Sequence, residues 1–182
     1  MKKEAMEVLR NRRSIRKYKQ EQITEEELNT VLELGTYAPT AKGLQCPVIV
    51  AVQDKETVAL LSRLNRQILS EIRGKPLEEI ADPYFGAPTI VLVFAPRSVN
   101  TFVEDGSAVM SQLLLAAYAA GLGSCWINRE QQMFELPEGI ALKEKWGLSE
   151  EYAGIGGLSL GYADCAHPEP IARKDGYVVI VK

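Results

Sequence analysis

Apolar positions along the chain switch between the spacing of helices and the spacing of strands. Apolar residues three and four positions apart predict helices at residues 5–9, 24–35, 61–72, 105–120 and 140–146. Short runs rich in β-branched residues predict strands at residues 48–52, 89–94, 124–127, 154–161 and 177–181. The chain contains no repeat, linker or low-complexity segment. The pattern therefore favours an α+β fold in a single domain that spans residues 1–182.

Local signals indicate where two of these helices begin and where a loop interrupts the pattern. Thr24 followed by Glu27 has the spacing of a capping box, which predicts a helix start, and Gly35 predicts the end of that helix. Asp105 is a favourable N-cap residue, so we expect the long Ala- and Leu-rich helix to begin there. Residues 37–45 have no sustained period and contain a proline and a glycine, which predicts a loop.

Composition and charge exclude several classes of protein. The formal charge of −3 argues against a general attraction to nucleic acid or to an anionic membrane, so any anion site is expected to be local. The strongest apolar stretch, residues 113–122, has about half the length needed to span a bilayer. The first residues lack the uninterrupted apolar core of a secretory signal. We therefore expect a cytoplasmic protein with no membrane or nucleic-acid partner.

The cysteines and the single histidine exclude two kinds of site. Cys46, Cys125 and Cys165 are widely spaced and show none of the paired spacings of zinc or iron–sulfur sites. His167, the one histidine, lies in a turn-like stretch between alanine and proline. A histidine-based catalytic triad and a multi-histidine metal site are therefore not expected.

A basic cluster near the amino terminus is the first candidate for chemistry. Arg12, Arg13, Ser14 and Arg16 place three guanidinium groups and a hydroxyl within five residues, directly after the first predicted helix. Guanidinium groups donate paired, charge-assisted hydrogen bonds to a phosphate, and a serine hydroxyl can bind a remaining oxygen. The cluster is thus a candidate anion site, with a solvated surface charge run as the alternative.

Four segments in order along the chain resemble signatures of the nitroreductase family of FMN enzymes. They read RRSIRKY at residues 12–18, APTAKGLQ at 38–45, GLGSCWI at 121–127 and PIAR at 170–173. Together they are more specific than any one of them. The resemblance implies a three-layer fold with a central, mostly antiparallel sheet flanked by helices. It also implies a homodimer with the flavin at the subunit interface.

The resemblance assigns the basic residues to the flavin phosphate and chain. Arg12, Ser14 and Arg173 would hold the FMN phosphate, and Arg13 belongs to the same cofactor-binding segment. Arg16 would reach the ribityl chain and the N1/O2 side of the flavin ring. A fixed cation there stabilises the reduced, anionic ring, so Arg16 would raise the reduction potential.

The second segment would run along the edge of the flavin ring that carries O2, N3 and O4. By resemblance its candidate contacts are Pro39, Thr40, Lys42 and Gln45; for Lys42 the alternative is an exposed loop lysine. The segment also departs from the common pattern, because Gly43 stands where many relatives have Asn, and Cys46 and Pro47 replace a frequent Pro-Trp pair. We expect these departures to affect the range of substrates more than FMN binding.

The third segment would bring backbone close to flavin N5. Trp126, Ile127 and Asn128 match the region that approaches N5 from one side in the family, leaving the other face open for substrates. A backbone donor supports the electron-rich centre without taking part in hydride transfer. For Trp126 ordinary core packing is the alternative.

The resemblance implies an oxidoreductase in which NAD(P)H and a small-molecule electron acceptor bind to one flavin face in turn. This order is a ping-pong cycle, and it requires no catalytic side chain. The sequence has no Gly-rich dinucleotide fingerprint, since residues 154–157 lack its spacing. The acceptor stays open among nitroaromatics, quinones, enones and free flavin, and the donor between NADH and NADPH. Two other functions also stay open: a flavin-binding or flavin-processing protein with little turnover, and a non-enzymatic anion-binding module.

Overall fold

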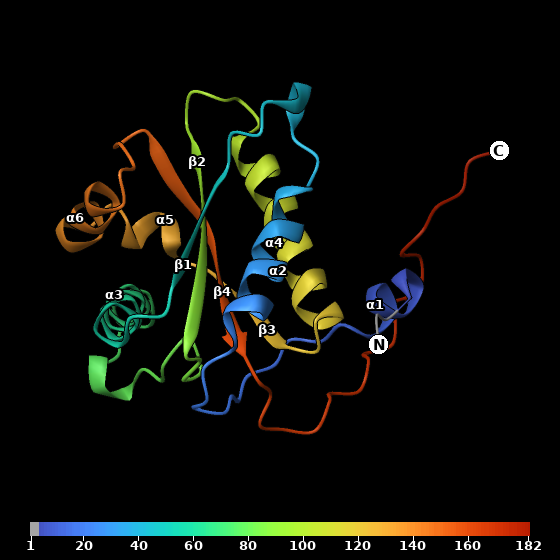
Figure 1. Cartoon of the computed structure of the whole chain (residues 1–182), viewed down its shortest axis with the longest axis horizontal. Helices are drawn as coiled ribbons and strands as arrows, with labels where there is room; N and C mark the ends of the chain where they lie inside the picture. The colour runs from blue at the N-terminus through green and yellow to red at the C-terminus, as the bar shows by residue number, and fades with distance from the viewer. Residues whose placement is uncertain (1–3) are drawn as a thin grey trace.

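A four-stranded antiparallel sheet lies between two groups of helices (Figure 1). The computed structural model describes residues 4–182, so the first three residues, part of the stretch that argued against a secretory signal, lie outside it. The strands follow the order β1-β2-β4-β3 across the sheet. Their bounds are Val48–Val52 for β1, Thr89–Pro96 for β2, Gly123–Ile127 for β3 and Tyr152–Gly161 for β4. All pairings between these strands are antiparallel, which confirms the expected α+β class.

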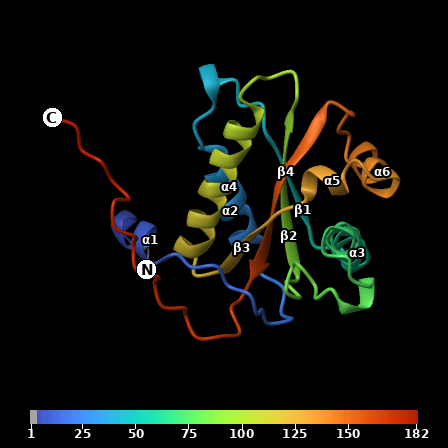
Figure 2. The same cartoon turned by 180° about the vertical axis from the view of Figure 1, so that it is seen from behind.

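The helices cover both faces of the sheet. Their bounds are Ala5–Asn11 for α1, Glu25–Thr36 for α2, Lys55–Arg73 for α3, Phe102–Ala119 for α4, Glu130–Met133 for α5 and Pro137–Lys145 for α6. Two opposite views show α2 and α4 on one face, α3, α5 and α6 on the other, and α1 beyond α4 (Figures 1 and 2). The arrangement is the expected three-layer fold. No helix within residues 4–182 combines the length and the apolar character that crossing a membrane requires.

Strand β2 explains why helices pack on both faces. All its residues are buried, and successive side chains of a strand point to opposite faces. Val91 and Val93 belong to the core formed with α2 and α4. Ile90, Leu92 and Phe94 belong to the core formed with α3, α5 and α6. A strand that is apolar from Ile90 to Pro96 therefore requires a helical layer on each side.

The capping box predicted for α2 is confirmed. The Thr24 hydroxyl accepts a hydrogen bond of 3.2 Å from the backbone N–H of Glu27, and the backbone N–H of Thr24 donates to the Glu27 carboxylate at 2.9 Å. Gly35 lies one residue before the helix end, where α2 meets α4. A Cβ at Gly35 would lie 2.5 Å from the side chain of Leu113, so glycine permits this close approach.

The predicted start of α4 at Asp105 is wrong. The helix begins at Phe102, with Thr101 at the N-cap position, and Asp105 lies inside the first turns with its N–H bonded to the Thr101 carbonyl at 2.8 Å. Its buried side chain bonds a separate loop through the backbone N–H of Ala41. The residue type favoured at a cap is therefore used here for a tertiary contact.

The strand predicted at residues 177–181 is also wrong. Beyond residue 165 the chain is irregular and ends in an extended segment that passes α1 (Figure 1, red). Its side chains from Tyr177 to Val181 are 68–91% exposed. β-branched residues favour extended backbone, but a strand forms only where a neighbouring strand supplies hydrogen bonds. The short helix α5 was not predicted because four residues are too few to show a period.

Candidate functional site: two cavities joined at Arg16

The basic segment that follows α1 is held in extended form against the end of the sheet. Ser14 forms a parallel bridge with Ser124 of β3, and the backbone N–H of Ile15 donates to the Ser124 carbonyl at 2.9 Å. Ile15 and Tyr18 are buried, and the Tyr18 hydroxyl donates to the Ile15 carbonyl at 2.7 Å. These apolar anchors fix the segment, so Ser14 and Arg16 lie beside β3.

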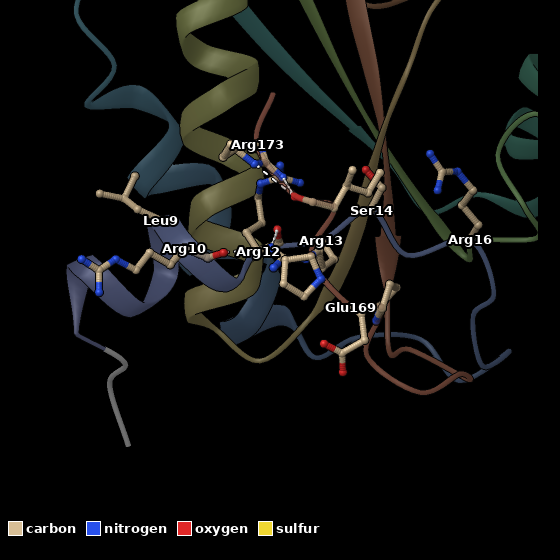
Figure 3. A pocket seen from close by; sticks show the side chains of 11 residues that line it. Leu9, Arg10, Arg12, Arg13, Ser14, Arg16, Glu169 and Arg173 are labelled. Atoms are coloured by element: carbon tan, nitrogen blue, oxygen red, sulfur yellow. Dashed lines mark hydrogen bonds between the residues drawn. The ribbon is translucent and has the colours of Figure 1, made fainter. Parts of the chain in front are cut away.

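A cavity of about 570 Å³ lies between this segment and the chain that follows β4 (Figure 3). The lining residues are Leu9, Arg10, Arg12, Arg13, Ser14, Arg16, Pro168, Glu169, Pro170, Ile171 and Arg173. Segments from opposite ends of the sequence therefore form its two walls. The structure brings together the first and the fourth candidate segments.

Positive charge dominates this cavity. Of its arginines, neither Arg12, Arg16 nor Arg173 forms an ion pair with any carboxylate within residues 4–182. Glu169 is the one acidic residue in the lining. The Arg173 group does donate to the backbone carbonyl of Ile171, from Nε at 3.2 Å and from Nη2. Guanidinium groups that no carboxylate engages are suited to an anion with several oxygens, such as a phosphate.

Arg13 differs from its neighbours because its guanidinium group holds the end of α1. Its Nη1 donates to the carbonyls of Arg10 at 2.9 Å and Arg12 at 2.8 Å. Its Nε is buried and has no hydrogen-bond partner among the described residues. Arg13 thus closes the helix end, and its guanidinium group is less free to bind a ligand than those of its neighbours.

The thiol of Cys125 on β3 is influenced by side chains of the basic segment. Burial raises the pKa of this thiol, whereas the charge of Arg16, a hydrogen bond with Ser14 and the charge of Arg12 act in the opposite direction. These groups therefore act on one point of β3. Arg16 extends away from the rest of the cluster (Figure 3).

Arg16 also lines a second cavity, of about 450 Å³, between α3 and the end of β3. The other lining residues are Asn65, Leu69, Arg73, Ala81, Asp82, Pro83, Phe85, Cys125, Trp126, Ile127, Asn128 and Arg129. The Arg16 guanidinium carbon lies 5.9 Å from the centroid of the Phe85 ring. Trp126, Ile127 and Asn128, the candidates of the third segment, thus meet the first segment at Arg16.

Two residues that contribute to the lining of the second cavity each have a buried polar atom without a partner among the described residues. Asn65 of α3 donates from Nδ2 to the carbonyl of Asn128 at 2.8 Å, but its Oδ1 has no hydrogen-bond partner within residues 4–182. The indole Nε1 of Trp126 is in the same condition. Buried polar atoms are normally hydrogen-bonded, so these two atoms are exceptions. Asn65 is fully buried, and the Trp126 ring packs on the α2 and α4 side of the sheet, where its Nε1 lies beside Gly156. Sequence reasoning missed Asn65, because a polar residue in a helix pattern is ordinarily taken as exposed.

The second candidate segment lies elsewhere in the same chain. Thr40 and Gln45 line a third cavity, of about 380 Å³, beside α2 and Val109 of α4. Pro39 and Lys42 are exposed and line none of the three cavities. The segment lies at the opposite end of α4 from α1 (Figure 1). Within one chain, the structure does not bring these residues to the basic cluster.

Known proteins share the sequence pattern and the fold of this chain. The model of the nitroreductase family matches residues 9–162. The chain belongs to the nitroreductase family. An FMN-bound nitroreductase from Bacteroides fragilis NCTC 9343 superposes with a TM-score of 0.89 at 28% identity, over 99% of this chain and 100% of the other. An FMN-dependent nitroreductase from Clostridium difficile R20291 gives 0.71 at 29% identity, over 95% and 94%.

One relative by sequence has a name that includes an electron donor. The NADPH-flavin oxidoreductase of Vibrio harveyi is 29% identical over 180 residues, which is 96% of this chain and 72% of that protein. The range matched by the nitroreductase family model contains the first three candidate segments but ends before Arg173. The structure nevertheless places Arg173 at the same cavity as Arg12.

Proposed function

We propose that this member of the nitroreductase family binds FMN and transfers electrons from NAD(P)H to an organic acceptor such as a nitroaromatic or a quinone. The observation that carries the proposal is the position of Arg16, which lines both an arginine-rich cavity and a second cavity that Phe85 also lines. FMN has a charged phosphate at one end and a planar ring at the other. The two cavities differ in the same way.

The residues of both cavities fit this cofactor. Arg12, Arg173 and Ser14 would bind the phosphate, since they provide charge-assisted donors that no carboxylate engages within residues 4–182. At the second cavity, the Phe85 ring and the Arg16 guanidinium group would lie beside the flavin ring. The backbone of residues 126–128 would provide one wall beside the ring.

Bound FMN would supply a ring that accepts a hydride and passes electrons on. The chain would contribute position and electrostatics. Arg16 would place its charge beside the ring, where it favours negative charge and so raises the reduction potential. No side chain of the two cavities is assigned as an obligatory general acid, and protons for the product would come from water.

A homodimer would complete the site, because Thr40 and Gln45 lie at a different cavity of the same chain. A second copy would bring its own residues 39–45, including Pro39 and Lys42, to the flavin. Apolar side chains exposed on α1 and on the carboxyl-terminal segment, such as Met6 and Ile171, support an interface there. The cytoplasmic location remains a prediction from the sequence.

Purification followed by a visible spectrum and a turnover assay tests the proposal. We expect a yellow protein with about one FMN per subunit, which oxidises NADPH or NADH when a quinone or a nitroaromatic is added. A colourless protein that does not take up added FMN would favour an anion-binding module. A yellow protein that oxidises neither donor would favour a flavin-processing role. Either result contradicts the proposed oxidoreductase.

A further inference from the structure

A buried carboxyl group lies behind the wall of the second cavity. Glu130 begins α5, directly after Asn128 and Arg129 of that wall, and its side chain is almost fully buried at 1% exposure. Its Oε1 accepts a hydrogen bond of 3.0 Å from the hydroxyl of Tyr84. Its Oε2 has no hydrogen-bond partner in the part of the chain that the structure describes. An ionised carboxylate with an unbonded oxygen in such a place is costly, which favours the neutral acid.

The surroundings of Glu130 contain little charge to stabilise an anion. The segment before β2 contributes the Tyr84 phenol, α3 contributes the neutral Asn65, and β4 contributes glycine backbone, while Arg129 precedes Glu130 itself. Asp82 acts on Tyr84 and adds negative charge nearby. Burial raises the pKa of Glu130 to about 8, although its own N–H, the Tyr84 hydroxyl, the Gly157 N–H and the charge of Arg129 oppose that shift.

Strand β4 has glycine at the positions where Glu130 packs. A Cβ at Gly157 would lie within clashing distance of Glu130 Oε1, and one at Gly154 would lie 2.7 Å from the Glu130 carbonyl oxygen. Glycine weakens a strand interior, and a close approach of other atoms is one reason for its presence there. The sheet therefore provides a fitted space for this one acidic residue.

The turn before Glu130 is held from two sides. Asn65 binds the Asn128 carbonyl, and the Tyr84 hydroxyl, which also lies 3.7 Å from Met133 Sδ, binds the Glu130 carboxyl group. Between these contacts Arg129 has a φ of 92°, in the region that side-chain-bearing residues rarely adopt. Such backbone persists where surrounding contacts enforce it.

We propose that Glu130, bonded to Tyr84 and seated against β4, is a positioning residue that fixes residues 128–130 and thereby shapes the wall of the second cavity. The inference concerns the cavity wall itself, and its meaning for FMN rests on the proposed function. Glu130 touches neither substrate nor cofactor in this role. Its protonated form is the one that the site accommodates.

The pH dependence of unfolding tests this without any cofactor. A carboxyl group whose pKa is raised on folding contributes stability below its unfolded pKa of about 4.5, and that contribution is lost as pH rises toward about 8. Glu130→Gln cannot ionise. We therefore expect the unfolding constant of the wild type, relative to Glu130→Gln, to rise about a hundred-fold or more between pH 5 and pH 8.

A matched control for the pH series is Glu135→Gln, which changes an exposed carboxylate paired with Arg97 at 2.7 Å. The unfolding constant of the wild type, relative to that of Glu135→Gln, should not rise in this way between pH 5 and pH 8. Tyr84→Phe removes a hydrogen bond that lowers the Glu130 pKa, so the loss of stability should extend to higher pH. If the ratio of the two unfolding constants, wild type to Glu130→Gln, does not change between pH 5 and pH 8, the inference that Glu130 is neutral in the folded protein is wrong.

Positioning is tested with Trp126 as a reporter. The chain has two tryptophans, so Trp146→Phe leaves Trp126 as the only one. In that background Glu130→Ala should shift the Trp126 emission and increase its quenching by acrylamide, and Glu130→Gln should restore the wild-type signal. FMN affinity should fall about ten-fold in Glu130→Ala and recover in Glu130→Gln.

The outcomes separate the two proposals. If Glu130→Ala does not fold, Tyr84→Phe is measured in its place. It should shift the Trp126 emission in the same direction but by a smaller amount. Unchanged Trp126 emission and FMN affinity in the folded variant would overturn the positioning role. A wild type that binds no FMN would contradict the proposed function, yet the pH series and the Trp126 signal would still decide the role of Glu130.

Discussion

The Asp105 carboxylate on α4 accepts a hydrogen bond of 3.0 Å from the backbone N–H of Ala41 in the loop before β1. The same buried side chain accepts from the Thr101 hydroxyl at 3.2 Å and from the Cys46 thiol at 3.5 Å. Both ends of the loop are therefore attached to one residue. This attachment helps to hold Lys42 in left-handed backbone, with a φ of 53°.

Replacing Asp105 with alanine should destabilise the protein and loosen this loop. The change leaves donors without their acceptor, which costs about 1–3 kcal/mol in the free energy of unfolding. Asp105→Asn keeps one side-chain oxygen for the Ala41 N–H and should cost less. Urea unfolding and protease cleavage within residues 40–46 measure both effects. Glu104→Ala changes an exposed acid one residue earlier, and an equal loss in that control would contradict the anchoring role.

Arg12→Ala and Arg173→Ala should each weaken FMN binding about ten-fold or more, because each removes a charge-assisted contact of roughly 1.5–3 kcal/mol. The fold should persist, since neither guanidinium group is buried in the core. Flavin titration measures the affinity. Lys17→Ala is a matched control, because Lys17 lies in the same segment, pairs with Asp164 at 2.9 Å and lines neither cavity. Wild-type affinity in both arginine variants would reject the phosphate site.

The parts of this structure that could be predicted from sequence are those with a repeated or clustered signal. Strand β2 follows from an unbroken apolar run, and the cluster of arginines around one cavity from three arginines next to a helix end. Asn65 and Glu130 gave no such signal, because a single polar residue carries no sign of whether it faces the core. Asp105 gave a misleading one, since the same side chain suits a helix cap and a distant backbone N–H.

The carboxyl-terminal segment shows another limit of sequence patterns and leads to a prediction about assembly. Residues 177–181 have the composition of a strand but no partner strand among residues 4–182, and an exposed apolar run of this kind favours pairing with another molecule. We predict a homodimer in which this segment contacts a second copy. Removing residues 176–182 should weaken the dimer and lower FMN affinity.

Light scattering and sedimentation over a dilution series test this prediction. Val179→Lys combined with Val181→Lys keeps the length of the segment but removes its apolar character, and it should weaken the dimer in the same direction. Asp175→Ala, an exposed change before the apolar run, should leave the mass unchanged. A monomer that holds one FMN would contradict the shared site.

The last prediction concerns the order of the two half-reactions. Arg16 lines both the arginine-rich cavity and the second cavity, and the sequence has no dinucleotide fingerprint that would give NAD(P)H a separate fold. Donor and acceptor should therefore use the same flavin face in turn. Stopped-flow mixing with NADPH or NADH should bleach the flavin at a rate that does not depend on the acceptor, and a later addition of quinone should restore the spectrum.

Steady-state kinetics give the decisive form of that test. When the donor is varied at several fixed acceptor concentrations, double-reciprocal lines should be parallel, because each substrate reacts with a different form of the enzyme. Either substrate in large excess should inhibit, since it would occupy the face that the other requires. Intersecting lines, together with flavin reduction that occurs only when acceptor is already present, would mean that both substrates bind at once and that the shared-face order is wrong.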